Sequence, residues 1–247
     1  MKKSVLILVM LLCFSTSAFA GKSIVVAVPA TIPPIAFVGD DGQLTGYSVD
    51  YINAVAKAAG FEVVLKNVAW SGIFAGLARS DFDVICGAVA ITEKRKKVVD
   101  FTDKYFDVWH ALVVRKDSTV KSLAELKGKK VGGKLGSVGF QALKNVEGIE
   151  PVVYEEVSLL LEALKEKEVE AIVYAEPMVH YYIEKQYKDT LKIAAIVNSD
   201  EEKDQIGMAV KKGNSEVLDL LTKGMAAVKG GPAEKEMKKK WLSDRQK

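Results

Sequence analysis

The segment Asp107-Val-Trp-His-Ala-Leu-Val-Val114 determines how the chain is arranged, because it lies between two similar units. Before it, the stretch Leu77 to Ile85 consists of a leucine, four residues and Phe-Asp-Val-Ile. After it, the stretch Leu164 to Ile172 consists of a leucine, four residues and Val-Glu-Ala-Ile. Each unit has the pattern of a helix end followed by a short buried strand. The sequence therefore predicts two similar lobes, with the quoted segment as a strand that leaves one and enters the other.

A second apolar segment, Ile206 to Val210, follows the second unit and can carry the chain back to the first lobe. The predicted limits are residues 21–110 together with 207–247 for lobe 1, and residues 111–206 for lobe 2. Two crossings between α/β lobes form a hinge, and ligands of such folds bind at the carboxyl ends of the strands. We therefore expect a ligand-binding cleft between the lobes.

Within each unit, short apolar runs alternate with helical patterns. Ile24 to Val28 is typical of a buried strand, and Asp50 is a candidate N-cap for a helix that Gly60 ends. Thr92 is a second candidate N-cap, and Ser122 to Glu125 has the pattern of a capping box before a short helix. This alternation predicts an α/β fold with a largely parallel sheet in each lobe, flanked by helices.

The composition is that of a globular protein of 247 residues, 49% hydrophobic and 27% charged. This length suits one large domain or two small ones. Lys and Arg total 35 and Asp and Glu total 32. Because binding to phosphates requires a concentrated basic excess, we do not expect nucleic acid as a partner.

Residues 1–20 have the pattern of a secretory signal peptide: a charged start at Lys2-Lys3, an apolar run from Val5 to Phe14, and small residues around a cleavage site at Ala18-Phe-Ala20. The apolar run is too short to span a bilayer, and the residue before Cys13 is not the small one that a lipoprotein signal has. We expect cleavage after Ala20 and export to the periplasm. The mature chain then keeps one cysteine, Cys86, and forms no internal disulfide.

The chain has no recognisable catalytic motif. His110 and His180 lack the spacing of metal ligands, and Cys86 has no nearby histidine, so structural roles are expected for all three. The glycine-rich stretch Gly132 to Gly139 has neither the lysine of a phosphate loop nor the dinucleotide fingerprint. The sequence thus predicts no cofactor and no metal site.

Two residues are better candidates for binding a small molecule. Trp70 lies at a strand end just before a helix, where it can face a cleft or pack in the core. Arg95 lies in the first turn of the helix that Thr92 can cap, so its guanidinium and nearby backbone N–H groups could converge on one carboxylate. A solvated arginine among the neighbouring lysines is the alternative, and residue types and spacing leave both interpretations open.

Four segments carry the most distinctive sequence of the chain: Gly46 to Asp50, Trp70 to Ile73, Ala90 to Thr102, and Leu126 to Gly132. In this order they resemble the family 3 solute-binding proteins of ABC transporters for polar amino acids. The resemblance covers the chain from about Ile24 to Trp241, and the Thr-Glu-Lys-Arg run with Asp-Phe-Thr after it is its most specific part. It implies a two-lobe periplasmic-binding-protein fold of type II. It also implies a periplasmic receptor that closes on its ligand and passes it to a membrane ABC permease. Separately from the resemblance, we expect a monomer.

The resemblance also implies where the ligand binds. Arg95 matches the arginine that holds the ligand α-carboxylate, and Trp70 matches an aromatic residue that packs on the ligand. The remaining expected positions lie in the rim of lobe 1 and in the closing loop and strand end of lobe 2: Ile32, Gly87, Ala88, Ala90, Lys134, Ser137, Val138 and Ala175.

The chain departs from the family at several of these positions. Ala90 replaces a Ser or Thr hydroxyl, Ala88 stands where Ser or Gly is common, and Ile32 replaces an aromatic residue that covers the ligand. Near the first strand, Pro29 stands where several members have an acidic residue. The family's helix start also has an acid where this chain has Ser48.

The largest departure is Ala175, which falls where the family has the acid that holds the ligand ammonium. Loss of one partner of a buried charge pair costs about 2–5 kcal/mol, about 30-fold to several thousandfold in affinity. An ordinary amino acid would therefore bind poorly unless another group replaces the acid. The neighbouring Glu176 would point to the opposite face of a strand, unless the backbone turns at the strand end.

We therefore expect a non-enzymatic transport receptor for a small carboxylate-bearing ligand, with a polar amino acid as the first candidate. A carboxylate without an ammonium group is the alternative ligand. The alternative activity is that of a cyclohexadienyl-dehydratase-like enzyme on the same scaffold, with Glu176 as acid and Lys134 as its electrostatic partner. The sensing lobes of a larger receptor are a third possibility, against which the lack of any transmembrane pattern counts.

Overall fold

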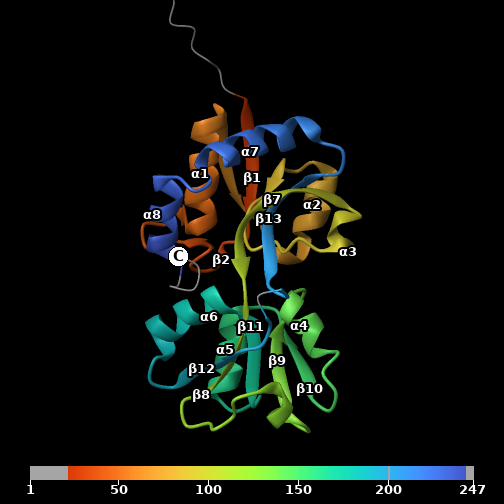
Figure 1. Ribbon diagram of the computed structural model, residues 1–247, viewed down its shortest axis with the longest axis vertical. Helices are drawn as coiled ribbons and strands as arrows, with labels where there is room; N and C mark the ends of the chain where they lie inside the picture. Colours follow the sequence, from red (N-terminus) through yellow and green to blue (C-terminus); the bar gives the residue numbers. More distant parts are fainter. Residues whose placement is uncertain (1–21, 200, 243–247) are drawn as a thin grey trace, which may run out of the picture.

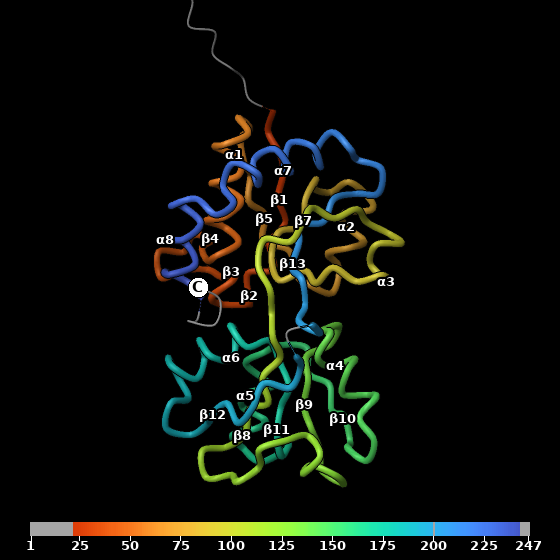
Figure 2. The backbone as a smooth tube through the Cα atoms, viewed as in Figure 1, coloured from red at the N-terminus to blue at the C-terminus, as the bar shows by residue number. Residues whose placement is uncertain are grey.

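The computed structural model describes residues 22–199 and 201–242, which form two lobes stacked along the long axis of the molecule (Figure 1). The chain passes between the lobes at two places that lie side by side (Figure 2). The two-lobe α/β fold predicted from the repeated units is thus confirmed. The predicted signal peptide lies outside the described residues.

Lobe 1 is built on a five-stranded sheet with the strand order β5-β1-β6-β13-β7. Strand β1 pairs in parallel with β5 and β6, whereas β13 runs antiparallel to both of its neighbours. A small three-stranded sheet, β2-β3-β4, lies beside it. The strands of lobe 1 are β1 (Ser23–Val28), β2 (Thr31–Ile32), β3 (Ala36–Val38), β4 (Leu44–Thr45), β5 (Glu62–Asn67), β6 (Val84–Ile85), β7 (Val99–Val108) and β13 (Asp204–Lys211).

Helices cover both faces of this sheet. On one face, Ile24 and Val26 of β1 pack with Tyr51 of α1 and Leu221 of α7. On the other face, the alternate residue Ala27 packs with α2, as the two-residue period of a strand requires. The helices of lobe 1 are α1 (Tyr47–Ala59), a 3₁₀ turn (Trp70–Gly72), α2 (Ile73–Arg79), α3 (Glu93–Lys96), α7 (Ser215–Val228) and α8 (Pro232–Trp241).

Lobe 2 repeats this plan with the strand order β10-β9-β11-β8-β12. Strand β9 pairs in parallel with β10 and β11, and β8 runs antiparallel to both of its neighbours. The strands are β8 (His110–Arg115), β9 (Lys130–Lys134), β10 (Glu150–Tyr154), β11 (Ala171–Ala175) and β12 (Leu191–Ile196). The helices are a 3₁₀ turn (Leu123–Leu126), α4 (Val138–Leu143), α5 (Val157–Lys165), α6 (Glu176–Tyr182) and a π-helical turn (Ile183–Tyr187).

Each five-stranded sheet contains one strand that is antiparallel to its neighbours, and in both lobes it is the strand that enters from the other lobe. Strands β7 and β12 end at the junction and leave their lobe, whereas β8 and β13 enter the other lobe from the junction (Figure 2). An arriving strand must run away from the junction, while the strands around it run towards it. Each sheet is therefore largely parallel, as predicted, with one reversed strand that is the arriving one.

The start of α1 differs from the prediction, because Asp50 is not its N-cap. The helix begins at Tyr47 after Gly46, whose φ of 119° turns the chain. The N–H of Tyr47 donates to the carbonyl of Pro34, so backbone takes the place of a side-chain cap. Asp50 instead accepts a hydrogen bond from Trp241 Nε1 at 2.7 Å, which ties α8 to α1.

The other predicted helix ends have mixed outcomes. Gly60 ends α1 in the left-handed conformation, and Thr92 caps α3 by accepting a hydrogen bond from the Arg95 N–H at 3.2 Å, both as predicted. Ser122 donates to Glu125 Oε1 at 2.8 Å, but only a single 3₁₀ turn follows rather than a helix. Throughout residues 22–199 and 201–242, the helices are too short or too polar to cross a bilayer.

Candidate functional site

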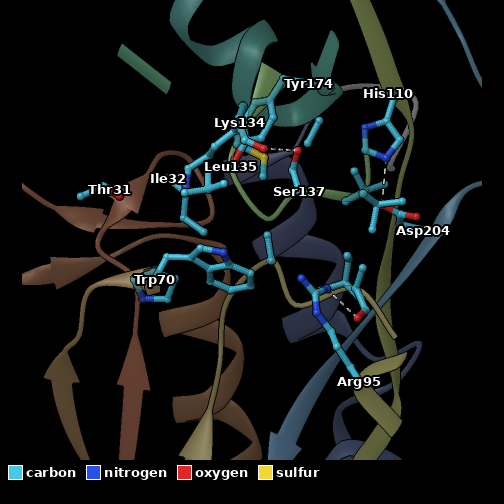
Figure 3. A pocket seen from close by; sticks show the side chains of 18 residues that line it. Thr31, Ile32, Trp70, Arg95, His110, Lys134, Leu135, Ser137, Tyr174 and Asp204 are labelled. Atoms are coloured by element: carbon cyan, nitrogen blue, oxygen red, sulfur yellow. Dashed lines mark hydrogen bonds and ion pairs between the residues drawn. The ribbon is translucent and has the colours of Figure 1, made fainter. Parts of the chain in front are cut away.

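A pocket lies between the lobes, where the carboxyl ends of strands from both sheets meet (Figure 3). Pro29 follows β1 and Ala88 follows β6, while Lys134 ends β9 and Ala175 ends β11. Side chains of both lobes line the pocket, and a junction between two domains is a preferred place for small-molecule sites. This is the location that the two predicted crossings indicated.

The pocket brings together nearly all of the residues expected to bind the ligand. Gly87 is the exception, since it does not line the pocket. Its carbonyl accepts a hydrogen bond from the Tyr105 hydroxyl, and the Pro29 ring lies 2.9 Å from where a Cβ would be. The expected residues that line the pocket are Ile32, Trp70, Ala88, Ala90, Arg95, Lys134, Ser137, Val138 and Ala175.

Arg95 joins the two lobes. Its Nη1 donates to the Ala90 carbonyl of lobe 1 at 2.9 Å, and its Nη2 donates to the Gly136 carbonyl of lobe 2 at 3.2 Å. The guanidinium lies 5.3 Å from the ring centroid of Trp70 and 5.4 Å from that of Phe74, within cation–π range. Burial lowers the pKa of Arg95 from its ordinary value, although the group stays charged. The guanidinium carries further N–H donors with which it can bind a carboxylate.

Trp70 lies at the side of the pocket and faces the loop of lobe 2 (Figure 3). It begins the 3₁₀ turn before α2 and packs edge-on against Phe74 at 5.7 Å between ring centroids. A Cβ on Gly136 would lie 3.0 Å from Trp70 Nε1, so the loop of lobe 2 approaches the indole closely. Trp70 therefore borders the pocket and the junction of the lobes at the same time.

Lys134 is a buried cation at the end of β9, with 6% of the residue exposed. Burial lowers its pKa from the ordinary value, and the negative charges of Glu156 and Glu155 partly oppose this effect. Lys134 and Arg95 thus give the pocket two cationic side chains from opposite lobes.

Ser137 closes the turn that follows β9 rather than presenting a free hydroxyl. Its Oγ donates to the Lys134 carbonyl at 2.8 Å and accepts from the Phe140 N–H at 3.1 Å, which makes it the N-cap of α4. The loop from Lys134 to Val138 is thereby held in shape by its own hydrogen bonds. In this arrangement the loop contributes backbone groups to the junction, as the bond from Arg95 to Gly136 shows.

The acid expected from the resemblance is missing from the end of β11. Ala175 lines the pocket with a methyl group only, and it ends the strand. Glu176 begins α6, is 6% exposed and does not line the pocket. The turn at the strand end therefore does not bring this carboxylate to the ligand site.

Sequence reasoning missed a histidine and an aspartate at one end of the pocket. His110 begins β8 and Asp204 begins β13, and His110 Nε2 lies 2.9 Å from Asp204 Oδ2 (Figure 3). His110 was expected to be structural, and it does make this bond, but it also lines the pocket. Their positions in the sequence could have indicated this pair, because each residue lies at the start of a strand that enters a lobe from the junction.

The other lining residues that sequence reasoning missed are mostly apolar. They come from strand ends and from α6, which had no recognisable motif. They are Thr31, Val108, Leu135, Tyr174, Met178 and Ile206, together with Pro29, which was noted only as a departure from the family.

Cys86 and His180, for which structural roles were expected, do not line the pocket. Cys86 is fully buried, and burial raises the pKa of its thiol to about 12. His180 is exposed on α6, away from the pocket lining. No group of three or more His, Cys, Asp or Glu residues in the described part of the chain could hold a metal ion.

Comparison with known proteins gives consistent findings. The family model for bacterial extracellular solute-binding proteins, family 3, matches residues 24–244. The L-cystine-binding protein TcyJ of Escherichia coli (strain K12) is 31% identical over 223 residues, which cover 89% of this chain and 82% of the relative.

Solved structures agree with this match. An ancestral arginine-binding protein bound to arginine has a TM-score of 0.82 and 34% identity, covering 91% of this chain and 100% of the other. The ancestral arginine-binding protein bound to glutamine has a TM-score of 0.81 and 34% identity, with 89% and 97% covered. One scaffold thus accommodates two different amino-acid side chains.

Proposed function

The chain belongs to the bacterial extracellular solute-binding proteins of family 3, and on that premise we propose that it binds an amino acid between its lobes and delivers it to a membrane ABC permease. Its relatives are binding proteins, and the chain is likewise not an enzyme. The dehydratase alternative also lacks support from the pocket, because Glu176, its candidate acid, does not line it.

The observation that carries this proposal is the position of Arg95. Its guanidinium lies in the pocket, is partly desolvated and is oriented by the Ala90 carbonyl. A carboxylate on such a planar fork forms charge-assisted hydrogen bonds, which are stronger than those between neutral groups. We propose that Arg95 binds the ligand carboxylate and that Trp70 packs on an apolar part of the ligand.

The second lobe completes the site. Lys134 and the loop through Ser137 and Val138 would cover the ligand, with the methyl groups of Ala88, Ala90 and Ala175 and the side chain of Ile32 shaping the pocket walls. A ligand that touches both lobes has a higher affinity for the closed form, and this difference drives closure.

Calorimetry is the direct test of the ligand class. The protein should be unfolded and refolded to remove any bound molecule, and then titrated with the twenty standard amino acids, L-cystine, and a set of mono- and dicarboxylates. Micromolar or tighter binding of at least one amino acid supports the proposal. If only carboxylates without an amino group bind, the alternative ligand class is correct.

The remaining parts of the proposal concern the whole protein. We propose cleavage after Ala20, a periplasmic location and a monomeric state, which N-terminal sequencing of the exported protein and light scattering would test. We also propose that residues 21–110 with 207–247 move as one lobe and residues 111–206 as the other. Distances between spin labels should then change on ligand addition only when the labels lie in different lobes.

A further inference from the structure

The pocket contains one carboxylate that the family resemblance does not assign. Of the described residues that line the pocket, Asp204 is the one acid, facing the cations Arg95 and Lys134. An amino acid carries both a carboxylate and an ammonium group, and a buried ammonium needs an anionic or hydrogen-bonding partner. The methyl group of Ala175 cannot be that partner, whereas the carboxylate of Asp204 has the required charge.

The strand register places Asp204 close to the vacant position. Ala175, at the end of β11, lies directly opposite His110 at the start of the antiparallel strand β8. His110 Nε2 in turn lies 2.9 Å from Asp204 Oδ2. All three residues line the same pocket, so the ring of His110 links the end of β11 to the carboxylate of Asp204.

The hydrogen bonds of His110 orient the carboxylate of Asp204. An ionised carboxylate only accepts hydrogen bonds, so Nε2 carries the ring proton and donates it to Asp204. The other ring nitrogen, Nδ1, is buried and has no hydrogen-bond partner within residues 22–199 and 201–242. The bond to Asp204 is therefore the one side-chain hydrogen bond of the ring within the described residues, and it orients the carboxylate.

The surroundings of the ring keep it in this orientation. A Cβ on Gly139 would lie 2.8 Å from Nδ1, so the ring packs directly against the glycine of α4. The backbone N–H of His110 also donates to Asn198 Oδ1 at 2.7 Å. His110 is thus fixed on both sides and cannot readily turn Nε2 away from Asp204.

Arg95 and Asp204 place opposite charges in the same pocket, as a ligand with two opposite charges requires. The negative charge of Asp204 acts on the guanidinium, since it opposes the lowering of the Arg95 pKa that burial causes. In the close-up, Arg95 lies at the base of the pocket, with Asp204 and His110 on one side of it (Figure 3). A zwitterion can place its carboxylate on Arg95 and its ammonium beside Asp204.

We propose that Asp204, positioned by the ring of His110, binds the ammonium group of the ligand in place of the acid that is missing at Ala175. This inference rests on the proposed function, because it assumes that the ligand is an amino acid. Asp204 is the ligand-contacting residue, and His110 is a positioning residue that acts through it.

The first experiment compares two ligands on one variant. The tightest-binding amino acid of the calorimetric panel is paired with the analogue in which hydrogen replaces its α-amino group. Asp204→Asn keeps the shape of the side chain and removes its charge, so binding of the amino acid should weaken about 10- to 100-fold. Binding of the analogue should stay within about threefold of the wild type or become tighter, because a negative charge has been removed near a carboxylate. Asp219→Asn, on the exposed face of α7, is the matched control.

The second experiment tests the role of His110 with two substitutions. His110→Gln retains a side-chain N–H that can donate to Asp204, whereas His110→Phe retains only the ring shape. The preference for the amino acid over its analogue should fall at least about tenfold in the Phe variant and recover largely in the Gln variant. A residue with a purely structural role would change the affinity for both ligands equally. His180→Phe, the exposed histidine of α6, should change neither.

The outcomes distinguish failure of the proposed function from failure of the role assigned to Asp204. If the wild-type protein binds no amino acid, the proposed function and this inference both fail. If it binds the amino acid and its analogue equally well, the proposed function stands and this inference fails. If the wild type prefers the amino acid but Asp204→Asn weakens both ligands equally or neither, the proposed function stands and the role of Asp204 is wrong. Binding of the analogue by each variant also shows that the variant is folded.

Discussion

The two faces of the pocket differ in how they present their polar groups. Lobe 1 provides a side chain, Arg95, which is oriented by the Ala90 carbonyl and flanked by two aromatic rings. Lobe 2 provides mainly a loop, whose hydroxyl at Ser137 is used to hold the loop itself and whose Gly136 carbonyl meets Arg95. Lobe 1 is therefore prearranged to recognise a charge, whereas lobe 2 is shaped to close over it.

This difference suggests an order of events. The contacts that orient Arg95 within lobe 1 do not need the second lobe, so a ligand carboxylate can bind to the open form. The bond from Arg95 to Gly136 joins the lobes and exists only when they are together. Closure then adds contacts to a ligand that is already held, as a difference in affinity between two states requires.

The prediction with the largest expected effect tests whether lobe 1 recognises the ligand charge while lobe 2 mainly closes over the ligand. Arg95→Met should weaken ligand binding about 30-fold to several thousandfold, because it removes the charged partner of a buried carboxylate. Lys134→Met should cost about tenfold or less, because its single ammonium gives no planar fork for a carboxylate. Calorimetry with the tightest ligand of the panel measures both, and Lys94→Met on the exposed side of α3 is the control. An equal loss at Arg95 and Lys134 would remove the distinction between the lobes.

A smaller effect concerns stability at alkaline pH and belongs to lobe 1, where Cys86 follows β6. Burial raises the pKa of this thiol from 9.0 to about 12. The folded state therefore keeps the proton while the unfolded state loses it above pH 9, so the free energy of unfolding falls as the pH rises from 9 towards 12. The loss from this group should be about 2 kcal/mol at pH 10.5.

Urea unfolding at pH 8 and at pH 10.5 measures this effect in the wild type and in Cys86→Ala. The buried Tyr105 also has a raised pKa, mainly through burial and in part through Cys86, so removal of the thiol reduces its contribution to the alkaline loss as well. The variant should lose less stability between the two pH values than the wild type does. Parallel pH dependences would show that the thiol ionises readily in the folded state.

Two glycines with positive φ, one in the loop of lobe 2 and one in lobe 1, allow the effect of closure to be separated from the effect of backbone strain. Gly136 has a φ of 72°, and a Cβ there would lie 3.0 Å from Trp70 Nε1 across the junction. Gly42, in lobe 1, has a φ of 76° and open space where a Cβ would be. Each substitution by Ala should cost about 1–2 kcal/mol of stability through backbone strain alone.

Only Gly136→Ala should also weaken ligand binding, because its methyl group obstructs closure against Trp70. We expect about a tenfold loss, equivalent to about 1.4 kcal/mol, while Gly42→Ala should bind as the wild type does. Small-angle scattering with saturating ligand should show a larger radius of gyration for Gly136→Ala. If both variants bind normally, the loop does not need its close approach to the indole.

The smallest effects concern two helix caps. Thr92→Val removes the cap of α3, which carries Arg95, and Ser137→Ala removes the cap of α4. Each should lower stability by about 1 kcal/mol, measured by urea unfolding. Thr92→Val should also weaken ligand binding a few fold because it loosens the first turn around Arg95. An equal effect of Ser137→Ala on affinity would mean that the loop of lobe 2 orients the ligand as strongly as α3 does.

Much of the fold was predictable because it depends on local patterns. The repeated helix-to-strand unit at Leu77 to Ile85 and Leu164 to Ile172 indicated two lobes, and the apolar segments between and after them indicated the crossings. The start of α1 was mispredicted, because its cap is the distant carbonyl of Pro34 rather than the side chain of Asp50. A side-chain cap can be read from neighbouring residues, but a backbone partner in another loop cannot.

The candidate site was predictable only where a motif carries it. Arg95 and Trp70 belong to segments that resemble a family, whereas Tyr174 and Met178 line the pocket without any such signal. Gly87 was expected in the pocket rim, but it does not line the pocket, and the Pro29 ring lies 2.9 Å from where a Cβ of Gly87 would be. Apolar lining residues have the same pattern as core residues, so sequence alone does not separate the two.

The sequence by itself indicated that the chain forms two α/β lobes, and its resemblance to a family predicted an arginine in the cleft and the absence of the expected acid at Ala175. Only the tertiary structure brought His110 and Asp204 close to Ala175. His110 and Asp204 are separated by 94 positions in the chain, and they meet because both arriving strands begin at the same junction. Periodicity and caps act over a few residues and leave a signal in the sequence, whereas contacts between strands that enter different lobes depend on the completed fold.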